Sequence, residues 1–78
     1  MMQKSIVDPK YKILCKILIK ARKDKGITQA GLAARLKKPQ SFISKYESGE
    51  RRLDVIELVE VCKAIEIDPA EILGSVNS

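Results

Sequence analysis

Two glutamines eleven positions apart, Gln29 and Gln40, each stand at the start of a short segment whose apolar residues have helical spacing. A glutamine amide carries both donors and an acceptor, so it can pair with adenine N6 and N7 in the major groove of DNA. The first turn of a helix adds unpaired backbone N–H groups, which attract anions. The chemistry predicted at Gln40 is therefore recognition by hydrogen bonding.

The residues that follow this glutamine place more polar groups on the outward arc of the same expected helix. Ser41 and Ser44 can donate or accept, and Lys45 can reach a guanine edge or a phosphate. Phe42 leaves two alternatives open: its ring packs on a thymine methyl group, or it folds back between two helices as part of the core. We favour the exposed ring, because Ile43 already occupies the inward position.

Cations flank this helix on both sides. Lys38 lies in the short turn before it, and Arg51 and Arg52 lie in the loop after it. We expect these three side chains to contact the DNA backbone, which positions a protein without reading sequence. The alternative is ordinary solvated surface charge, and it is stronger for Lys38 than for the arginines.

The formal net charge of +5 is spread unevenly along the chain. Residues 1–26 hold eight Lys/Arg against two acidic residues, residues 27–53 hold six against two, and residues 54–78 hold one against six. This asymmetry indicates an anionic partner for the first two segments and a different role for the last. Alternatively, the lysines merely confer solubility.

Rigid elements must hold these side chains, and the sequence predicts an all-α domain of five helices. An aspartate followed by proline marks a helix start at Asp8 and again at Asp68, and Gly74 marks the end of the last helix. We expect a flexible arm at residues 1–8, the domain at 9–74 and a frayed tail at 75–78. The expected helices span residues 9–25, 29–36, 40–48, 55–65 and 70–73.

One stripe of each long helix is apolar and is expected to face a common core. Small Ala33 allows the second and third expected helices to approach closely. In the fourth helix the stripe consists of Val55, Leu58, Val59, Cys62 and Ile65.

Several function classes are excluded by composition. Without histidine, a phosphate-binding loop or a carboxylate pair outside an ordinary solvent face, the chain offers no enzyme site, metal site or cofactor site. Cys15 and Cys62 lie within apolar helical patterns, so we expect buried reduced thiols and not a disulfide. We find no signal peptide, and lysines interrupt the longest apolar stretches, which predicts a cytoplasmic protein without a membrane partner.

In order and spacing, these features resemble the Cro/Xre-type helix-turn-helix domains, the lambda-repressor-like fold of phage repressors and many bacterial regulators. The resemblance covers residues 18–73. It implies double-stranded DNA binding, with the helix-turn-helix at the second and third helices. The residues that carry it are Ile27-Thr28-Gln29, Leu32-Ala33, the run from Gln40 to Gly49, and the pattern Leu58, Ala64-Ile65 and Ile67.

The resemblance also implies roles for individual residues. Gln29 would touch a phosphate and brace Gln40 at the first turn of the recognition helix. Arg22 and Glu47 fall where the family resemblance implies a structural ion pair, which would tie the first helix to the end of the recognition helix.

Three positions depart from the family pattern. Lys37 and Glu66 stand where glycine is frequent, and a left-handed backbone at a non-glycine residue costs about 1 kcal/mol or signals a reshaped turn. Pro39 occupies the usual cap position of the third helix, where serine or threonine would bond free amides. The angle of the recognition helix is therefore not fixed by the resemblance.

We expect a sequence-specific transcriptional regulator, a repressor that acts as a homodimer on a palindromic operator. The apolar positions left for a dimer seam around the last two helices are Ile56, Ile72 and Val76. The alternative is an antitoxin or other protein-interaction module, whose acidic last helices dock a basic toxin or part of the transcription machinery.

Overall fold

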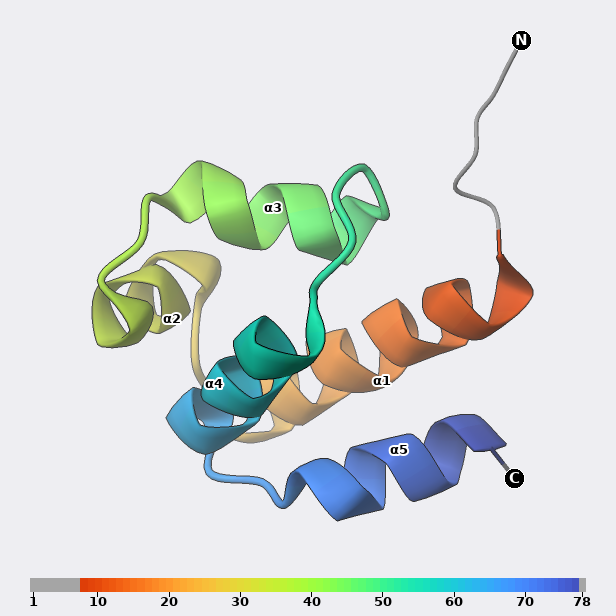
Figure 1. Ribbon diagram of the computed structural model, residues 1–78. Coiled ribbons are helices and arrows are strands. Elements are labelled where there is room, and N and C mark those ends of the chain that lie inside the picture. Colours follow the sequence, from red (N-terminus) through yellow and green to blue (C-terminus); the bar gives the residue numbers. More distant parts are fainter. Residues whose placement is uncertain (1–7, 78) are drawn as a thin grey trace, which may run out of the picture.

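The computed structural model describes residues 8–77, which form five helices and no strand (Figure 1). The predicted all-α, five-helix fold is confirmed. The expected arm lies outside the described residues apart from Asp8, and so does Ser78 of the expected tail. The helices are α1 (Pro9–Asp24), α2 (Gln29–Leu36), α3 (Gln40–Ser48), α4 (Val55–Ile65) and α5 (Pro69–Asn77).

Side-chain caps fix where the helices begin. The Asp8 carboxylate accepts from the Lys10 amide at 2.9 Å, and the Thr28 hydroxyl accepts from the Gly31 amide at 2.9 Å. At α4, Asp54 and Glu57 each accept from the other's backbone N–H, at 2.7 and 3.0 Å. Each of these starts lies where the sequence predicts it.

The last helix corrects the sequence prediction. α5 does not stop at Gly74 but continues to Asn77, and the Ser75 hydroxyl donates to the Glu71 carbonyl one turn earlier at 3.0 Å. Gly74 is not among the residues with positive φ, so it acts here as an ordinary helical residue. Ile72, expected at a dimer seam, is only 1% exposed and belongs to the core.

The buried stripe of α4 also differs from the expected one. Val55 is 73% exposed, because it lies in the first turn and beyond the edge of the core, whereas Val61 is buried. Tyr46 is fully buried. The largest fully buried side chains are Tyr46, Leu18, Leu32, Ile43, Ile65, Ile72, Val61 and Cys62.

Both cysteines are free thiols inside this core, as expected. Burial raises the pKa of Cys15 and of Cys62, which keeps both thiols protonated. The Cys15 thiol donates to the Tyr46 carbonyl at 3.2 Å and so connects α1 to α3.

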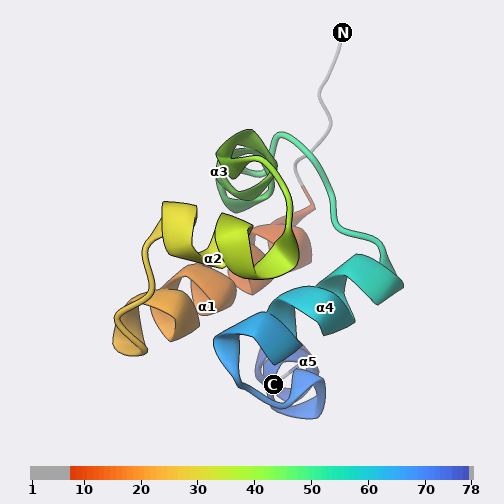
Figure 2. The same ribbon diagram turned by 90° about the vertical axis from the view of Figure 1, so that its left-hand side faces the viewer.

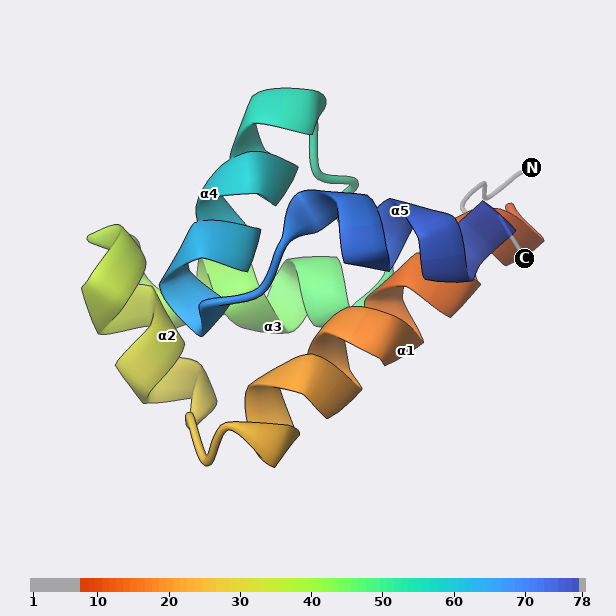
Figure 3. The ribbon, with the colours of Figure 1, turned by 90° about the horizontal axis from the view of Figure 1, so that it is seen from below.

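The helices are arranged so that α3 lies at the edge opposite α5 (Figure 1). α5 returns along α1, and its C-terminal end lies beside the start of α1 (Figure 3). α2 packs against both α3 and α4, which places the α2–α3 pair on a base formed by the other helices (Figure 2). No helix in residues 8–77 has the length and apolarity needed to span a bilayer.

Candidate nucleic-acid interface

The turn between α2 and α3 keeps a left-handed geometry although it contains no glycine. Lys37 has φ 57° and ψ 43°, and the Lys38 amide donates to the Ala33 carbonyl at 3.0 Å. This hydrogen bond closes the end of α2 tightly. Lys37 therefore adopts the left-handed conformation despite its strain, and the turn is not reshaped. Glu66, with φ 66°, does the same at the end of α4.

Pro39 precedes α3 with extended backbone angles and provides no side-chain cap. Its carbonyl accepts from the Phe42 amide at 3.0 Å. Since no side-chain oxygen competes for the first amides of α3, the positive end of the helix dipole is open to an anion. Pro39, which departs from the usual serine or threonine cap, therefore leaves the N-terminal end of α3 available to an anion.

Gln29 and Gln40 meet across the turn. The Gln40 amide nitrogen donates to the Gln29 side-chain oxygen at 3.3 Å. The Gln29 nitrogen in turn donates to Glu47 at 2.9 Å. Gln40 is exposed and Gln29 is half-buried. Gln40, the first residue of α3, is therefore exposed to solvent while it is hydrogen-bonded to Gln29, which Glu47 in turn holds in place.

Behind the glutamines lies a buried ion pair. Arg22 Nε and Nη2 donate to the two carboxylate oxygens of Glu47 at 2.7 and 3.0 Å, and Arg22 Nη1 donates to the Ile27 carbonyl at 2.8 Å. Both charged side chains are under 10% exposed. The contacts form one chain, Arg22 to Glu47 to Gln29 to Gln40, which joins α1, α2 and α3.

The outward arc of α3 carries Ser41, Ser44 and Lys45, and all three are exposed. The Ser44 hydroxyl donates to the Ser41 carbonyl at 3.2 Å, which leaves its oxygen free to accept. Phe42 lies between the two alternatives drawn from the sequence. Its ring is half-buried and packs edge-on against Tyr46, with 5.9 Å between the ring centroids.

Arg51, in the loop after α3, is held by contacts with Glu57 and Phe42. Arg51 Nη1 and Nη2 donate to Glu57 at 2.9 and 2.8 Å, and its guanidinium lies 4.8 Å from the centroid of the Phe42 ring. The hydrogen bonds from Arg51 are the main cause that lowers the pKa of Glu57 to about 2. Lys38 lies over the same ring, with Nζ 5.3 Å from its centroid.

Tyr11 fixes the same loop from α1. Its hydroxyl donates to the Arg51 carbonyl at 2.9 Å and accepts from the Leu53 amide at 3.1 Å. Arg52 lies 5.2 Å from the centroid of the Tyr11 ring and 3.8 Å from the Asp8 carboxylate. Burial is the largest of the causes that raise the pKa of Tyr11 to about 12, so its hydroxyl stays a donor at neutral pH.

Sequence reasoning missed the roles of Tyr11 and Glu57 at this loop. The capping signal at Asp54 marks Glu57 as a cap residue, but nothing in the spacing indicates that it also binds Arg51. No local pattern places Tyr11 beside a loop that lies forty residues away.

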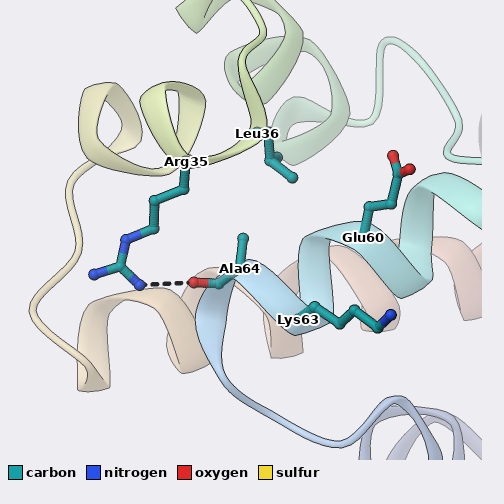
Figure 4. A pocket seen from close by; sticks show the side chains of 5 residues that line it. All are labelled: Arg35, Leu36, Glu60, Lys63 and Ala64. Carbon is teal, nitrogen blue, oxygen red and sulfur yellow. Dashed lines mark hydrogen bonds between the residues drawn. The ribbon is translucent and has the colours of Figure 1, made fainter.

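A shallow pocket on another side of the molecule shows how α2 is fixed to its base (Figure 4). Arg35 reaches from α2 to the end of α4, where Nη1 donates to the Ala64 carbonyl at 2.8 Å. This contact caps the C-terminal end of α4 and lies away from the outward arc of α3. Its role is to hold α2 against α4. The other residues that line the pocket are Leu36, Glu60 and Lys63.

Comparisons with known proteins agree with this geometry. A helix-turn-helix family model matches residues 18–72. An XRE-family like protein from Pseudomonas syringae pv. tomato is 49% identical, with a TM-score of 0.85 over 88% of this chain and 84% of that one.

Two further structures are similar. The clp gene regulator ClgR from Corynebacterium glutamicum is 26% identical, with a TM-score of 0.80 over 87% of this chain and 88% of that one. A mutant of a restriction-modification controller protein, 24% identical, has a TM-score of 0.82 over 90% of this chain and 89% of that one, and shows the shared fold. A search of curated proteins found no match.

Proposed function

Because the chain belongs to the Cro/Xre-type helix-turn-helix family, we propose that it is a transcriptional regulator that binds double-stranded DNA sequence-specifically through α3. One observation carries the proposal: Gln40 presents its amide at the open N-terminal end of α3 and is held there through Gln29 by the buried Arg22–Glu47 pair. A reading group that is fixed before binding loses less conformational entropy on binding. The name of ClgR as a gene regulator supports the same role.

In this proposal the base contacts come from the exposed arc of α3. Gln40 pairs with an adenine, while Ser41 and Ser44 adapt to neighbouring bases, and Lys45 reaches a guanine edge or a phosphate. The width of the major groove admits a single helix in this way. Because the Phe42 ring is half-buried and covered by two cations, we do not assign it to a thymine methyl group.

The backbone contacts come from residues around this arc. Gln29 is the first residue of α2, and Lys38, Arg51 and Arg52 lie in the segments that flank α3. Each phosphate that Lys38, Arg51 or Arg52 neutralises releases condensed counterions, so affinity falls steeply as salt rises. The residues after position 53 carry a net negative charge, so that part of the chain repels the phosphates of DNA.

We further propose that two copies bind a palindromic operator and repress transcription there. One helix reads too few base pairs for a unique address, and twofold dimers place their recognition helices about 34–36 Å apart. Since Ile72 is core, the seam needs other apolar positions. Those with the largest exposure near α4 and α5 are Val55, Ile56 and Leu73, at 73%, 67% and 51%.

A second candidate is a protein-interaction module of the antitoxin kind. The observation that favours it is the segregation of exposed carboxylates on α4 and after it, at Glu60, Glu66, Asp68 and Glu71. This side suits a basic partner such as a toxin or part of the transcription machinery. Either function places the protein in the cytoplasm, with DNA or its partner.

Selection of bound duplexes from a random pool tests the proposal. We expect one enriched motif with twofold symmetry, and binding to it that weakens as salt rises. Mass measurement over a range of concentrations tests the dimer, and a mass that stays monomeric on the selected duplex contradicts it. Binding that is indifferent to sequence contradicts the specific function. Co-purification of a small toxin-like protein favours the second candidate.

A further inference from the structure

Phe42 holds two cations that come from opposite ends of α3. Lys38 belongs to the turn before the helix and Arg51 to the loop after it, yet Nζ and Cζ lie 5.3 and 4.8 Å from the same ring centroid. The face of an aromatic ring carries partial negative charge and attracts cations at this range. The ring itself is fixed, since it is half-buried and packs edge-on against the fully buried Tyr46.

Two like charges around one ring repel each other, and a nearby anion offsets this repulsion. Glu57 supplies that anion: it accepts two hydrogen bonds from Arg51, and the charge of Lys38 also contributes to lowering its pKa. Glu57 is held in place as part of the capping box that opens α4. The cluster therefore consists of one ring, two cations and one carboxylate, which we call the Phe42 cluster (Phe42, Lys38, Arg51 and Glu57).

Both cations keep donors for a further anion. Arg51 binds Glu57 end-on through Nη1 and Nη2, which leaves the side fork of Nε and the second Nη2 hydrogen. Within residues 8–77, the Lys38 ammonium makes no hydrogen bond or ion pair. The geometry of a guanidinium side fork matches two oxygens of a phosphate.

We propose that Phe42 is a positioning residue, whose ring presents Lys38 and Arg51 to phosphates of the DNA backbone beside α3. The inference rests on the proposed DNA-binding function and replaces the sequence expectation that Phe42 reads a thymine methyl group. A positioning role affects all DNA sequences alike, because phosphates are the same at each step. A reading role affects one base pair.

A double-mutant cycle with Lys38→Gln and Phe42→Leu tests the coupling. Leucine keeps apolar packing but removes the ring face, and Phe42→Tyr restores that face as the matched control. We expect Phe42→Leu to weaken binding about two- to fivefold for each cation released, equally on the selected and a scrambled duplex. Lys38→Gln should lower the slope of log affinity against log salt by about 0.9 in the parent and by less in Phe42→Leu.

A DNA-free measurement keeps the inference separate from the proposed function. In proton NMR spectra of the parent protein, the ring should shift the Lys38 side-chain signals upfield relative to those of Lys37. Because this measurement does not use the variant, it tests the contact even if Phe42→Leu does not fold. Unshifted Lys38 signals overturn the inference, and so do purely additive effects in the cycle or a loss confined to one base pair. If the protein binds no duplex at all, the proposed function fails and this role with it, whatever the ring shift shows.

Discussion

Gln29 and Glu47, eighteen residues apart on α2 and α3, are joined by a hydrogen bond of 2.9 Å. This contact connects the side of the molecule that we propose faces DNA to the buried Arg22–Glu47 pair. On one side Gln29 accepts from Gln40, and on the other Glu47 receives two hydrogen bonds from buried Arg22. One carboxylate therefore fixes both the packing of α1 on α3 and the side chain that braces Gln40.

Glu47→Ala should lower stability far more than it alters base preference. The substitution leaves Arg22 buried without its counter-charge, which costs about 3–5 kcal/mol. In a domain of this size each kcal/mol lowers the melting temperature by about 4–8 °C. The matched control is Lys20→Ala, which removes the exposed pair with Asp24 and should cost less than about 1 kcal/mol. An unchanged melting temperature for Glu47→Ala would contradict the structural role.

The two buried tyrosines should respond oppositely to loss of the hydroxyl group. Among the described residues the Tyr46 hydroxyl is buried without a hydrogen-bond partner, so Tyr46→Phe should leave stability unchanged or raise it, by at most about 1–3 kcal/mol. Tyr11→Phe removes a donor to Arg51 and an acceptor for Leu53, and should lower stability by a similar amount. Urea denaturation of both variants measures the difference. Equal destabilisation would mean that the Tyr46 hydroxyl has a partner.

Much of the fold could be predicted because its signals are local. The caps at Thr28 and Asp54 and the glycine at position 49 fix helix ends through bonds within a few residues, and these ends agree with the structure. Gly74 misled the prediction because a glycine ends a helix only where the backbone turns left-handed. Whether it does depends on packing, and here α5 continues along α1.

The candidate site likewise combines residues that a local sequence pattern predicts with contacts that it does not predict. The arc of Ser41, Ser44 and Lys45 follows from helical period alone, and the structure places it on the surface. The Arg22–Glu47 contact was expected from family resemblance and not from spacing, since twenty-five residues separate the partners. Tyr11 and Glu57 contact the Arg51 loop because of the way α1 and α4 pack. No local sequence pattern encodes this packing.

The Glu57–Arg51 pair should make stability depend on pH in the acid range. The pKa of Glu57 falls from its ordinary 4.5 to about 2 in the folded protein, so its contribution is present above about pH 4.5 and is lost as pH falls toward 2. Glu57→Gln keeps an acceptor for the Asp54 amide but removes the charge. The melting temperatures of parent and variant should therefore differ most above pH 4.5 and converge near pH 2. A gap that does not change with pH would contradict the pairing.

Lys37→Gly should stabilise the turn before α3. Lys37 has φ 57°, and relief of left-handed strain is worth about 1–2 kcal/mol, partly offset by the greater backbone freedom of glycine when unfolded. We expect a net gain of about 0.5–1 kcal/mol in the free energy of unfolding. Ala34→Gly, an exposed position inside α2, is the control and should lose about the same amount. A loss for both variants would show that Lys37 carries no strain.

Selection of bound duplexes from a random pool, run in parallel for the parent and Gln40→Ala, tests sequence reading by α3 most directly. The parent should enrich a motif with two symmetric half-sites. Gln40→Ala should enrich the same motif without its preference at one base pair of each half-site, because that contact supplies about 1–3 kcal/mol of discrimination. A parent pool without any enriched motif, or a variant motif unchanged at every position, would contradict the account.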